Sequence, residues 1–543
     1  MQPTPDTASD NYDLIIIGGG INGAGIARDA GMRGIRTLLL EAGDFGSGTS
    51  SWSSRLIHGG LRYLEYAEIG LVRESLRERR LLLEHAPHLV RPLKLTIPIY
   101  KGARRGRLLI RLGMLAYDAL SLGKALPPHE MLGRDEVLDA APGLNADGLL
   151  GAATYYDAQV SFAERLVLEN VLDAAARGVT VCNYSRVESI SARENGWHTV
   201  IAESPTGVQH TARARVVINA AGPWVDYVLD CTPVEQPDYM GGTKGSHIIV
   251  GTFPGAPTDA FYVEAKSDGR PFFILPWNGQ VLIGTTDIRI DGNPADAAAS
   301  DGEIDYLITE TNRVFPEASL SREDIHFVYA GVRPLPRKED GPESAITRAH
   351  IIKRHASPLD GMLSIIGGKL TTYRSLAEEA VDKVCDLLGQ RRGNCPTRDT
   401  ALPGATAQVE EDGDPTPAFA ALSDSGQRRL VSVYGARTRR LAVICQNEPT
   451  LARSLDEAGL VLAAEVALAV RDEMARTLVD IVHRRLMVGL AADYDASLIA
   501  AIADVAAVEF GWSEDDRDAE LEVLRDYDSR LQRRVTTTER ATG

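Results

Sequence analysis

The chain opens with a pattern of apolar and polar positions that predicts a strand, a tight turn, a helix and a second strand. The segment is YDLIIIGGGINGAGIARDAGMRGIRTLLLEAGD, residues 12–44. Leu14 to Ile17 form a short apolar run, an alanine-rich helical stretch follows, and Thr37 to Leu40 form a second buried run. Because crossover connections between parallel strands are right-handed, these elements predict a parallel βαβ unit.

The pattern changes three times further along the chain. Residues 61–87 predict a long helical stretch that ends before Pro87. From about 244 to 330 short strands alternate, and Asn278-Gly279 between two apolar runs indicates a hairpin with a type I′ turn. From about 400 onward Ala, Leu, Glu and Arg recur with helical spacing, which predicts a helical C-terminal region.

Composition limits the classes of protein and partner. The 543 residues are 44% hydrophobic, and single cores stop growing at about 250–300 residues, so we expect two or three domains. The net charge of −17, from 58 basic and 75 acidic residues, disfavours nonspecific nucleic-acid binding. We therefore expect no nucleic-acid partner, and an anionic ligand needs a local cationic pocket.

Cysteine usage and the chain start indicate a cytosolic compartment. The five cysteines are scattered and include no CxxC pair, and the eleven histidines show no HxH or HExxH spacing. We therefore expect reduced thiols and no metal site. Residues 1–11 are polar without an apolar h-region, and no stretch approaches the roughly 18 apolar residues of a membrane span. Any membrane contact is expected to be peripheral.

A nucleotide-binding fingerprint lies in the first predicted turn. Gly18 permits the tight turn, Gly20 lets backbone amides approach a pyrophosphate, and Gly23 lets helix and strand pack closely. Glu41 ends the next strand and can accept hydrogen bonds from both ribose hydroxyls of an adenosine. The fingerprint alone does not separate FAD from NAD.

Two further segments have residue types suited to a flavin. The hydroxyls of residues 49–54 can bind the pyrophosphate from the other side, although the segment also reads as a polar surface loop. In GGKLTTYR, residues 367–374, two glycines precede the N-cap candidates Thr371 and Thr372, and Gly389 ends the following apolar helical face. Free amides at this helix start would stabilise negative charge on a reduced flavin.

These motifs carry a family resemblance. IGGGINGAGIARDAGMRG together with GGKLTTYRSLA resembles the paired signature of the FAD-dependent glycerol-3-phosphate dehydrogenases. SSRLIHGGLRYLE, KGSHIIV, PWNGQVLIGTTD and GVRPL lie between them in the family's order. The resemblance covers residues 12 to about 390 and continues more diffusely beyond. One departure is Ala221, where many relatives have threonine, which removes a possible side-chain contact to the dinucleotide.

The resemblance implies an α/β fold with three parts. A discontinuous Rossmann-like FAD-binding domain is expected over 12–90, 150–235 and 330–390. An antiparallel-sheet cap that binds substrate is expected over 91–149 and 236–329, and an α-helical C-terminal domain over 391–543. We also expect a homodimer, with the helical C-terminal region as a candidate interface, while the sequence leaves the oligomeric state open.

The resemblance also assigns residues to the site. Substrate-pocket positions match Lys369, Arg333 and Arg62, and Arg374 and Tyr63 are further candidates, since arginine and lysine bind phosphate monoesters. A surface ion pair is the alternative role for any one of these arginines. The expected FAD contacts are Gly18, Gly20, Asn22, Gly23, Glu41, Thr49, Ser50, Ser51, Ser54, Leu56, Ile57, His58, Val187, Ala221, Gly222, Gly331, Gly368, Leu370 and Thr371.

The implied reaction is oxidation of sn-glycerol 3-phosphate to dihydroxyacetone phosphate, with hydride leaving C2 for flavin N5. His58 is the candidate base, because imidazole titrates near the working pH and the motif places it beside the ring. A flavin-orienting or packing histidine is the alternative role for His58. Lys369 or Arg333 can instead polarise the alkoxide.

A basic segment suggests where the electrons go. Residues 101–120 interleave cations with apolar side chains, which resembles a helix at a membrane interface; these are Lys101, Arg104, Arg105, Arg107, Arg111, Leu108, Leu109, Leu112, Leu115 and Tyr117. The alternative is a helix packed on its own domain with a solvated basic face. Members of the resembled family lie on the cytoplasmic face of the membrane and pass electrons to quinone.

Three rival functions stay open on the sequence. The first is a glycerol-3-phosphate oxidase that uses oxygen and releases peroxide, although the insertion common in such oxidases is not obvious here. The second is another FAD amine or amino-acid oxidase, which shares the N-terminal fingerprint but needs an Arg–Tyr pair for a carboxylate. The third is a non-catalytic nucleotide-binding scaffold.

Overall fold

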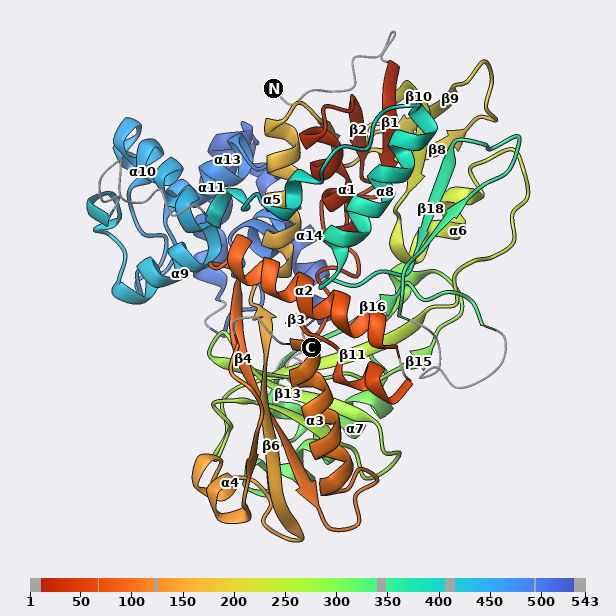
Figure 1. Cartoon of the computed structure of the whole chain (residues 1–543). Coiled ribbons are helices and arrows are strands. Elements are labelled where there is room, and N and C mark those ends of the chain that lie inside the picture. The colour runs from red at the N-terminus through yellow and green to blue at the C-terminus, as the bar shows by residue number, and fades with distance from the viewer. Residues whose placement is uncertain are drawn as a thin grey trace.

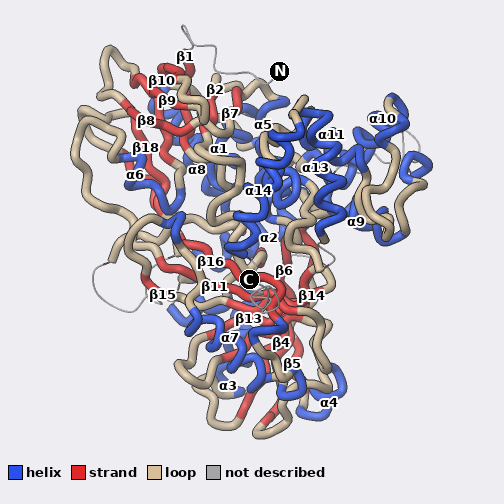
Figure 2. Tube along the Cα trace, turned by 180° about the vertical axis from the view of Figure 1, so that it is seen from behind, coloured by secondary structure: helices blue, strands red, loops and turns tan. Residues whose placement is uncertain are grey.

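Two large β-sheets and a group of C-terminal helices make up the molecule (Figure 1). The computed structural model describes residues 11–66, 68–121, 126–338, 348–405, 416–492 and 495–531. The polar segment at the start of the chain lies outside these ranges, apart from Asn11. Seen from behind, the first sheet lies at the upper left, most of the C-terminal helices lie at the upper right, and the second sheet lies below both (Figure 2).

The first sheet contains the predicted βαβ unit. Its order is β17-β18-β10-β1-β2-β7, with β9 and β8 added beside β10. Strands β18, β10, β1, β2 and β7 are parallel, and the inner strands are buried on both faces, which explains their continuous apolar runs. The strands are β1 Asn11–Ile17, β2 Thr37–Leu40, β7 Thr180–Cys182, β8 Arg186–Ile190, β9 His198–Glu203, β10 Gln209–Asn219, β17 Ile351–Arg354 and β18 Met362–Ile366.

The second sheet is almost wholly antiparallel, with order β15-β11-β14-β13-β12-β4-β6-β3, β16 beside β11 and β5 beside β6. Asn278 and Gly279 both have positive φ, at 48° and 74°, and join β13 to β14, so the predicted hairpin is confirmed. The strands are β3 Leu56–Ile57, β4 Val90–Tyr100, β5 Glu130–Leu132, β6 Leu149–Val160, β11 Thr243–Val250, β12 Ala260–Glu264, β13 Pro271–Trp277, β14 Gln280–Gly284, β15 Ile288–Arg289 and β16 Ile325–Arg333.

Helices cover the sheets and form the C-terminal region. Along the first sheet α1 packs against α5 and α8 (Figure 1). The helices before residue 390 are α1 Ile21–Met32, α2 Ile69–His85, α3 Arg107–Ser121, α4 Arg134–Ala140, α5 Ala163–Ala176, α6 Val225–Leu229, α7 Asp301–Val314 and α8 Tyr373–Leu388. Those after it are α9 Asp424–Tyr434, α10 Thr438–Asn447, α11 Ala463–Arg471, α12 Leu478–Asp480, α13 Ala496–Phe510 and α14 Glu514–Leu531, with a π-helical turn at Ile481–Arg485.

The expected fold class is confirmed, and the helix bounds differ in two places. The stretch 61–87 is not one helix: Leu61–Tyr66 forms a 3₁₀ helix, and α2 begins only at Ile69. The basic stretch 101–120 becomes helical only at Arg107. Within the described ranges, none of the helices combines the length and apolar character that a bilayer span requires. The expected domain boundaries remain a prediction.

The two sheets meet where the parallel strands end. The carboxyl ends of β1, β2, β10 and β18 lead directly into Gly18, Glu41, Ala220 and Gly367. In open α/β sheets, ligands bind outside these carboxyl ends. From the second sheet, β3 leads into His58 and β16 ends at Arg333. The segments with the predicted site residues therefore converge at one junction.

Candidate active site

The glycine turn after β1 has the backbone geometry that its sequence predicts. Gly18 has φ +107°, and a Cβ there would lie 2.7 Å from the Ala220 carbonyl oxygen. A Cβ at Gly23 would lie 1.8 Å from the Gly18 oxygen, so helix and turn touch. Gly20 caps α1 without a side-chain hydrogen bond in the described structure. The start of α1 therefore has the close-packed glycine geometry that a bound pyrophosphate would require.

Glu41 closes the turn from the neighbouring strand. Its carboxylate oxygens accept hydrogen bonds from the Gly19 amide at 2.6 Å and the Gly43 amide at 2.8 Å. Burial raises the pKa of Glu41, and these two amides act in the opposite direction. A carboxylate has about four lone-pair sites, so Glu41 keeps acceptors for ribose hydroxyls.

The hydroxyl-rich segment is tied into the junction on several sides. The Ser50 hydroxyl accepts from the Ile21 amide at 3.1 Å, which links it to the start of α1. Thr49 donates to the Val332 carbonyl at 2.6 Å, and Ser51 to the Gly46 carbonyl at 2.7 Å. The Ser54 hydroxyl lies 2.8 Å from His247 Nε2. These contacts place the segment beside α1 and β16, where the flavin hypothesis needs it.

The two signature motifs, far apart in sequence, touch each other. Asn22 donates from Nδ2 to the Gly367 carbonyl at 3.3 Å across 345 residues. A Cβ at Gly368, where φ is +100°, would lie 2.6 Å from the same nitrogen. The Asn22 Oδ1 atom is buried with no hydrogen-bond partner among the described residues. This cradle of bare backbone with an unsatisfied acceptor fits a bound dinucleotide cofactor.

The start of α8 differs in detail from the capping prediction. Thr372 occupies the N-cap position, but its side chain makes no cap bond in the described structure. The Thr371 hydroxyl instead accepts from the His58 amide at 3.2 Å. Gly389 ends the helix in the left-handed conformation, as predicted. In the part of the chain that the structure describes, the Thr372 side chain therefore leaves the first amides of α8 uncapped, and Thr371 ties this helix start to the His58 turn.

The remaining predicted FAD contacts surround the same junction or flank it. Leu56 and Ile57 are buried in β3 and pair with β6. A Cβ at Gly331 would lie 2.2 Å from the Trp52 carbonyl, so β16 packs closely against the hydroxyl-rich segment. Ala221 and Gly222 follow β10, Leu370 precedes α8, and Val187 lies in β8.

His58, Tyr63 and Lys369 come together from two segments. The rings of His58 and Tyr63 are stacked with centroids 6.4 Å apart. The Lys369 ammonium lies 4.4 Å from the centre of the Tyr63 ring and donates to the Ser75 hydroxyl at 3.0 Å. Burial lowers the pKa of Lys369 to about 8, against the opposing charges of Glu74 and Glu68. Burial also lowers the pKa of His58, so its imidazole is neutral at pH 7.

Arg333 belongs to a cluster of cations around one carboxylate. Asp287 pairs with Arg333 at 3.0 Å, Arg270 at 2.7 Å and Arg348 at 3.6 Å. Burial lowers the pKa of Arg333 to about 10, although Asp287 acts to raise it. Arg270 and Arg348 were not among the predicted site residues, because neither lies in a motif that carries the family resemblance. The available signal was Asp287 in GTTD, a lone acid in an otherwise uncharged motif.

Two predicted substrate residues stand apart from this group. The guanidinium of Arg374 is buried and bonded to Glu78 at 2.6 and 2.8 Å and to Glu378 at 2.9 Å. These contacts are those of a structural ion pair, but a buried one, whereas the alternative considered for such an arginine was an ion pair on the surface. Arg62 lies in the 3₁₀ helix Leu61–Tyr66, and its side chain is outside the described part of the structure.

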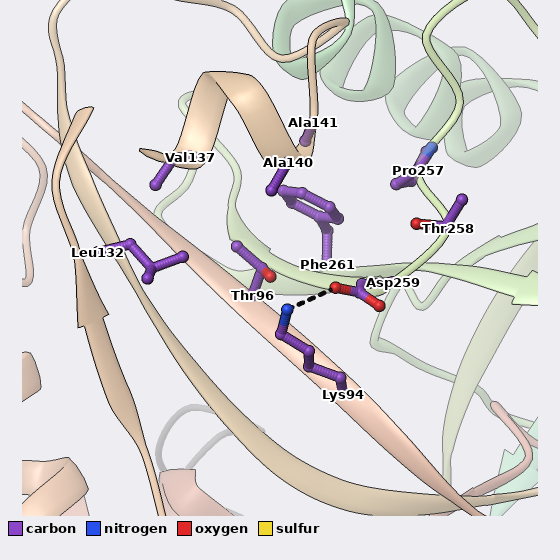
Figure 3. A pocket seen from close by; sticks show the side chains of 10 residues that line it. All are labelled: Lys94, Thr96, Leu132, Val137, Ala140, Ala141, Pro257, Thr258, Asp259 and Phe261. Atoms are coloured by element: carbon purple, nitrogen blue, oxygen red, sulfur yellow. Dashed lines mark ion pairs between the residues drawn. The ribbon is translucent and has the colours of Figure 1, made fainter. Parts of the chain in front are cut away.

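A separate pocket lies in the second sheet, away from these residues (Figure 3). It is lined by residues of β4, β5, α4 and β12 and the loop before β12, and Lys94 is paired with Asp259 across it at 3.0 Å. None of the predicted site residues lines it. We assign no ligand to this pocket. Within the described ranges, His, Cys, Asp and Glu residues form no group that could hold a metal ion.

The fold and the cradle define an FAD-dependent oxidoreductase. A family model described as FAD dependent oxidoreductase matches residues 13–374, and one described as the C-terminal domain of alpha-glycerophosphate oxidase matches residues 395–517. FAD is the cofactor of this class, and the cradle described above fits it.

Individual relatives give a narrower placement. The chain is 45% identical to a glycerol-3-phosphate dehydrogenase of Synechocystis sp., over 97% of this chain and 98% of that protein. It is 40% identical to a D-erythritol 1-phosphate dehydrogenase of Brucella abortus, over 88% and 94%. A crystal structure of the Bacillus halodurans glycerol-3-phosphate dehydrogenase with FAD matches at 30% identity and TM-score 0.76, over 97% and 96%. The chain belongs to the family of FAD-dependent glycerol-3-phosphate dehydrogenases.

Proposed function

We propose that the protein oxidises sn-glycerol 3-phosphate to dihydroxyacetone phosphate and passes the electrons to a membrane quinone. The observation that carries the proposal is the set of three guanidinium groups around Asp287. Three positive charges facing one carboxylate leave two in excess. A phosphate monoester carries close to two negative charges at neutral pH, so its charge matches the excess. Amino-acid oxidases bind a singly charged carboxylate, which this excess matches less well.

In this proposal the cations bind and the histidine takes the proton. Arg333, Arg348 and Lys369 hold the phosphate and orient the alcohol carbon toward the flavin. His58 accepts the hydroxyl proton at a ring nitrogen, because burial keeps its imidazole neutral at pH 7. FAD, when bound, supplies the two-electron acceptor for the hydride of C2. Glu41, Asn22 and the first amides of α1 and α8 hold the dinucleotide.

The test is a flavin spectrum. The purified protein should be yellow, and anaerobic addition of sn-glycerol 3-phosphate should bleach it. Arg348→Met should raise the concentration for half-bleaching about 10- to 100-fold, because a charge-assisted hydrogen bond is lost. Arg322→Met, which removes an exposed arginine paired with Asp301 and Asp305, is the control. A colourless protein after reconstitution with FAD would contradict the proposal.

The role of His58 has its own test. His58→Ala should slow flavin reduction by roughly 10²- to 10⁴-fold while sparing phosphate affinity, because only the proton acceptor is removed. His210→Ala is a matched control, since His210 lies in the first residues of β10, at the end of the strand away from the junction. An unchanged rate of flavin reduction in the His58 variant would show that His58 is not the base and has a packing role.

A second substrate deserves direct comparison, because a relative 40% identical over 88% of the chain is named D-erythritol 1-phosphate dehydrogenase. Both substrates are phosphorylated polyols, and the cation cluster recognises the phosphate that they share. Comparing kcat/KM for the two esters decides between them. We expect the glycerol ester to be preferred, since the relative at 45% identity is named for it.

The acceptor and the location are further parts of the proposal. Helix α3 exposes Leu108, Leu109, Leu112 and Leu115, between 51% and 72% each, next to exposed arginines. Such a helix fits the peripheral contact with an anionic membrane surface on the cytoplasmic face, where a quinone is available. Steady peroxide production without quinone reduction would instead favour the oxidase alternative. A homodimer remains our expectation, to be measured by light scattering.

A further inference from the structure

A buried cluster of charged and hydroxyl groups lies directly behind the turn that carries His58. Asp157, in β6, is 1% exposed, and its Oδ1 atom accepts hydrogen bonds from the Gly59 amide at 3.0 Å and the Tyr117 hydroxyl at 2.7 Å. Arg79, in α2, donates to the same oxygen and also to the Tyr156 carbonyl at 2.8 Å. The Tyr117 hydroxyl lies 3.1 Å from the Gly59 amide as well. One carboxylate oxygen thus joins α2, α3 and the His58 turn.

The turn itself has little freedom between this cluster and the substrate side. A Cβ at Gly59 would lie 2.3 Å from the Tyr117 hydroxyl oxygen, and one at Gly60 would lie 2.0 Å from the Tyr63 ring. Gly60 has φ +74°, a conformation that suits glycine. The His58 amide is held by Thr371 at 3.2 Å on the other side. The backbone at 58–60 is therefore fixed by contacts on both sides.

Charges reach the His58 ring from three elements. Asp157 on β6 raises its pKa, whereas Lys369 before α8 and Arg79 on α2 lower it. The Tyr63 ring faces it from the 3₁₀ helix. Asp157 and Arg79 act on His58 in opposite directions and pair with each other, so their electrostatic effects offset. What remains is the hydrogen bond from the Gly59 amide to Asp157, whose carboxylate Arg79 holds in place.

We infer that Asp157, Arg79 and Tyr117 are positioning residues, which hold the His58 turn so that the imidazole faces the substrate alcohol. The inference rests on the proposed function for the meaning of that position. A buried ion pair and a buried phenol at this place are not needed to fill the core, since apolar side chains of the same volume would pack as well. Asp157 and Tyr117 accept hydrogen bonds from the Gly59 amide in the turn that carries His58, and Arg79 fixes Asp157, which gives the three residues a specific task. Misplacement of a reacting group by about 1 Å slows a reaction by roughly 10²-fold.

The mildest test is Tyr117→Phe, which keeps the ring and removes the hydroxyl. We expect flavin reduction by sn-glycerol 3-phosphate to slow about tenfold, with the half-saturating concentration and the FAD content unchanged. Tyr434→Phe is the matched control, because the Tyr434 hydroxyl is buried and has no hydrogen-bond partner in the described structure. A wild-type rate in Tyr117→Phe, with its melting temperature unchanged, would overturn the inference.

A second measurement does not depend on turnover. Diethylpyrocarbonate modifies neutral imidazole, and at pH 8 His58 is neutral because burial lowers its pKa. The rate of His58 modification at pH 8, read by mass spectrometry of the His58 peptide, therefore reports how firmly the ring is held in place. Asp157→Asn should raise this rate several-fold, because a neutral amide binds Arg79 and the Gly59 amide more weakly than the carboxylate does. Asp173→Asn, which breaks another buried arginine pair at 2.7 Å, should leave the rate unchanged. A wild-type modification rate in a folded Asp157→Asn protein would also overturn the inference.

The two experiments separate this inference from the proposed function. If phosphorylated polyols fail to bleach wild-type flavin, the proposed function fails, and the modification rates still report whether the cluster controls the His58 turn. If wild-type flavin is bleached and neither variant differs from it, the proposed function stands and the inference fails.

Discussion

At the scale of single residues, Lys369 shows how burial tunes a binding group. Its ammonium is stacked on Tyr63 and bonded to Ser75, and burial lowers its pKa to about 8. The negative charges of Glu74 and Glu68 raise the pKa of Lys369, so the side chain is still protonated at neutral pH. A bound phosphate dianion stabilises the charged form further. Lys369 is therefore a cation whose charge is lost just above physiological pH.

This property predicts a pH dependence of binding. Above pH about 8 the free enzyme loses the Lys369 proton, so KM for the phosphate ester should rise with pH through this range. Lys369→Arg should remove the rise, because arginine stays charged, although its shape can raise KM overall. Lys369→Met should give a high KM that no longer responds to pH in this range. A KM that stays flat in the wild type from pH 7 to 9 would contradict the assignment.

Single residues also show which parts of the candidate site could be predicted from the sequence. Glycines that need bare backbone, at 18, 23 and 368, could be predicted because their motifs specify local geometry. Arg348 and Arg270 could not, because each reaches Asp287 through tertiary folding without a local motif. Arg374 lies within a motif, but Glu78 lies almost 300 residues earlier and occupies its guanidinium. Side-chain partners across such separations are not encoded in spacing.

At the scale of elements, α3 has two apolar faces, and packing decides their roles. Ile110, Met114 and Tyr117 are buried against the second sheet, whereas the four leucines named above are exposed. The expectation that Tyr117 belongs to the outward apolar side is wrong, because its hydroxyl reaches buried Asp157. The sequence contains both stripes, and its periodicity alone cannot say which one meets the protein. The break before α2 is similar, since Tyr63 packs on His58 and Lys369 instead of continuing a helix.

The outward face of α3 predicts binding to anionic vesicles. Arg105 is bonded to Glu65 and Glu264, so the available cations are Arg104, Arg107 and Arg111. Changing these three to glutamine should weaken vesicle partitioning roughly 100-fold, at about 1 kcal/mol for each charge near the surface.

The matched control for vesicle binding changes the same net charge elsewhere. Arg322, Arg525 and Arg530 are exposed and lie outside α3, and their glutamine variants should partition like the wild type. Sedimentation with vesicles of anionic lipid measures both sets. If the vesicles bind the α3 variant as fully as the wild type, the membrane contact must lie on another surface of the protein.

At the scale of the whole molecule, buried ion pairs join the C-terminal helices to the loop that follows β2. Asp44 lies three residues after Glu41 in this loop. The Asp44 carboxylate is bonded to Arg485 at 2.7 and 2.8 Å and to Arg484 at 2.6 Å. These arginines lie in the π-helical turn of the C-terminal region. The two guanidiniums hold the pKa of Asp44 well below its usual range despite burial. The C-terminal region therefore anchors one wall of the cofactor site.

The anchor predicts a loss of stability together with faster loss of FAD. Asp44→Asn removes the carboxylate that pairs with buried Arg485 and one of the two that pair with buried Arg484, which should reduce the free energy of unfolding by about 3–5 kcal/mol. In the wild type the contribution of Asp44 is present above its unfolded pKa near 3.8 and is lost as pH falls below it. Flavin fluorescence during a thermal ramp measures cofactor release.

An exposed pair supplies the control for this prediction. Arg80 and Glu84 pair at 3.0 Å on the surface of α2, where such a pair contributes about 0.5 kcal/mol or less. Glu84→Gln should therefore keep the wild-type melting and release profile. Equal profiles for Asp44→Asn and Glu84→Gln would show that the C-terminal anchor is not needed for cofactor retention.

The contact between Asn22 and Gly367 also has a temporal consequence. The two halves of the cradle are separated by 345 residues, so during translation the first half leaves the ribosome long before the second exists. At roughly 5–20 residues per second the wait is about 20–70 s. Once β10 has been synthesised, it lacks its neighbour β18 until residues 362–366 follow. The nascent chain must therefore carry an unfinished sheet edge, and FAD can be captured only when synthesis has passed the start of α8.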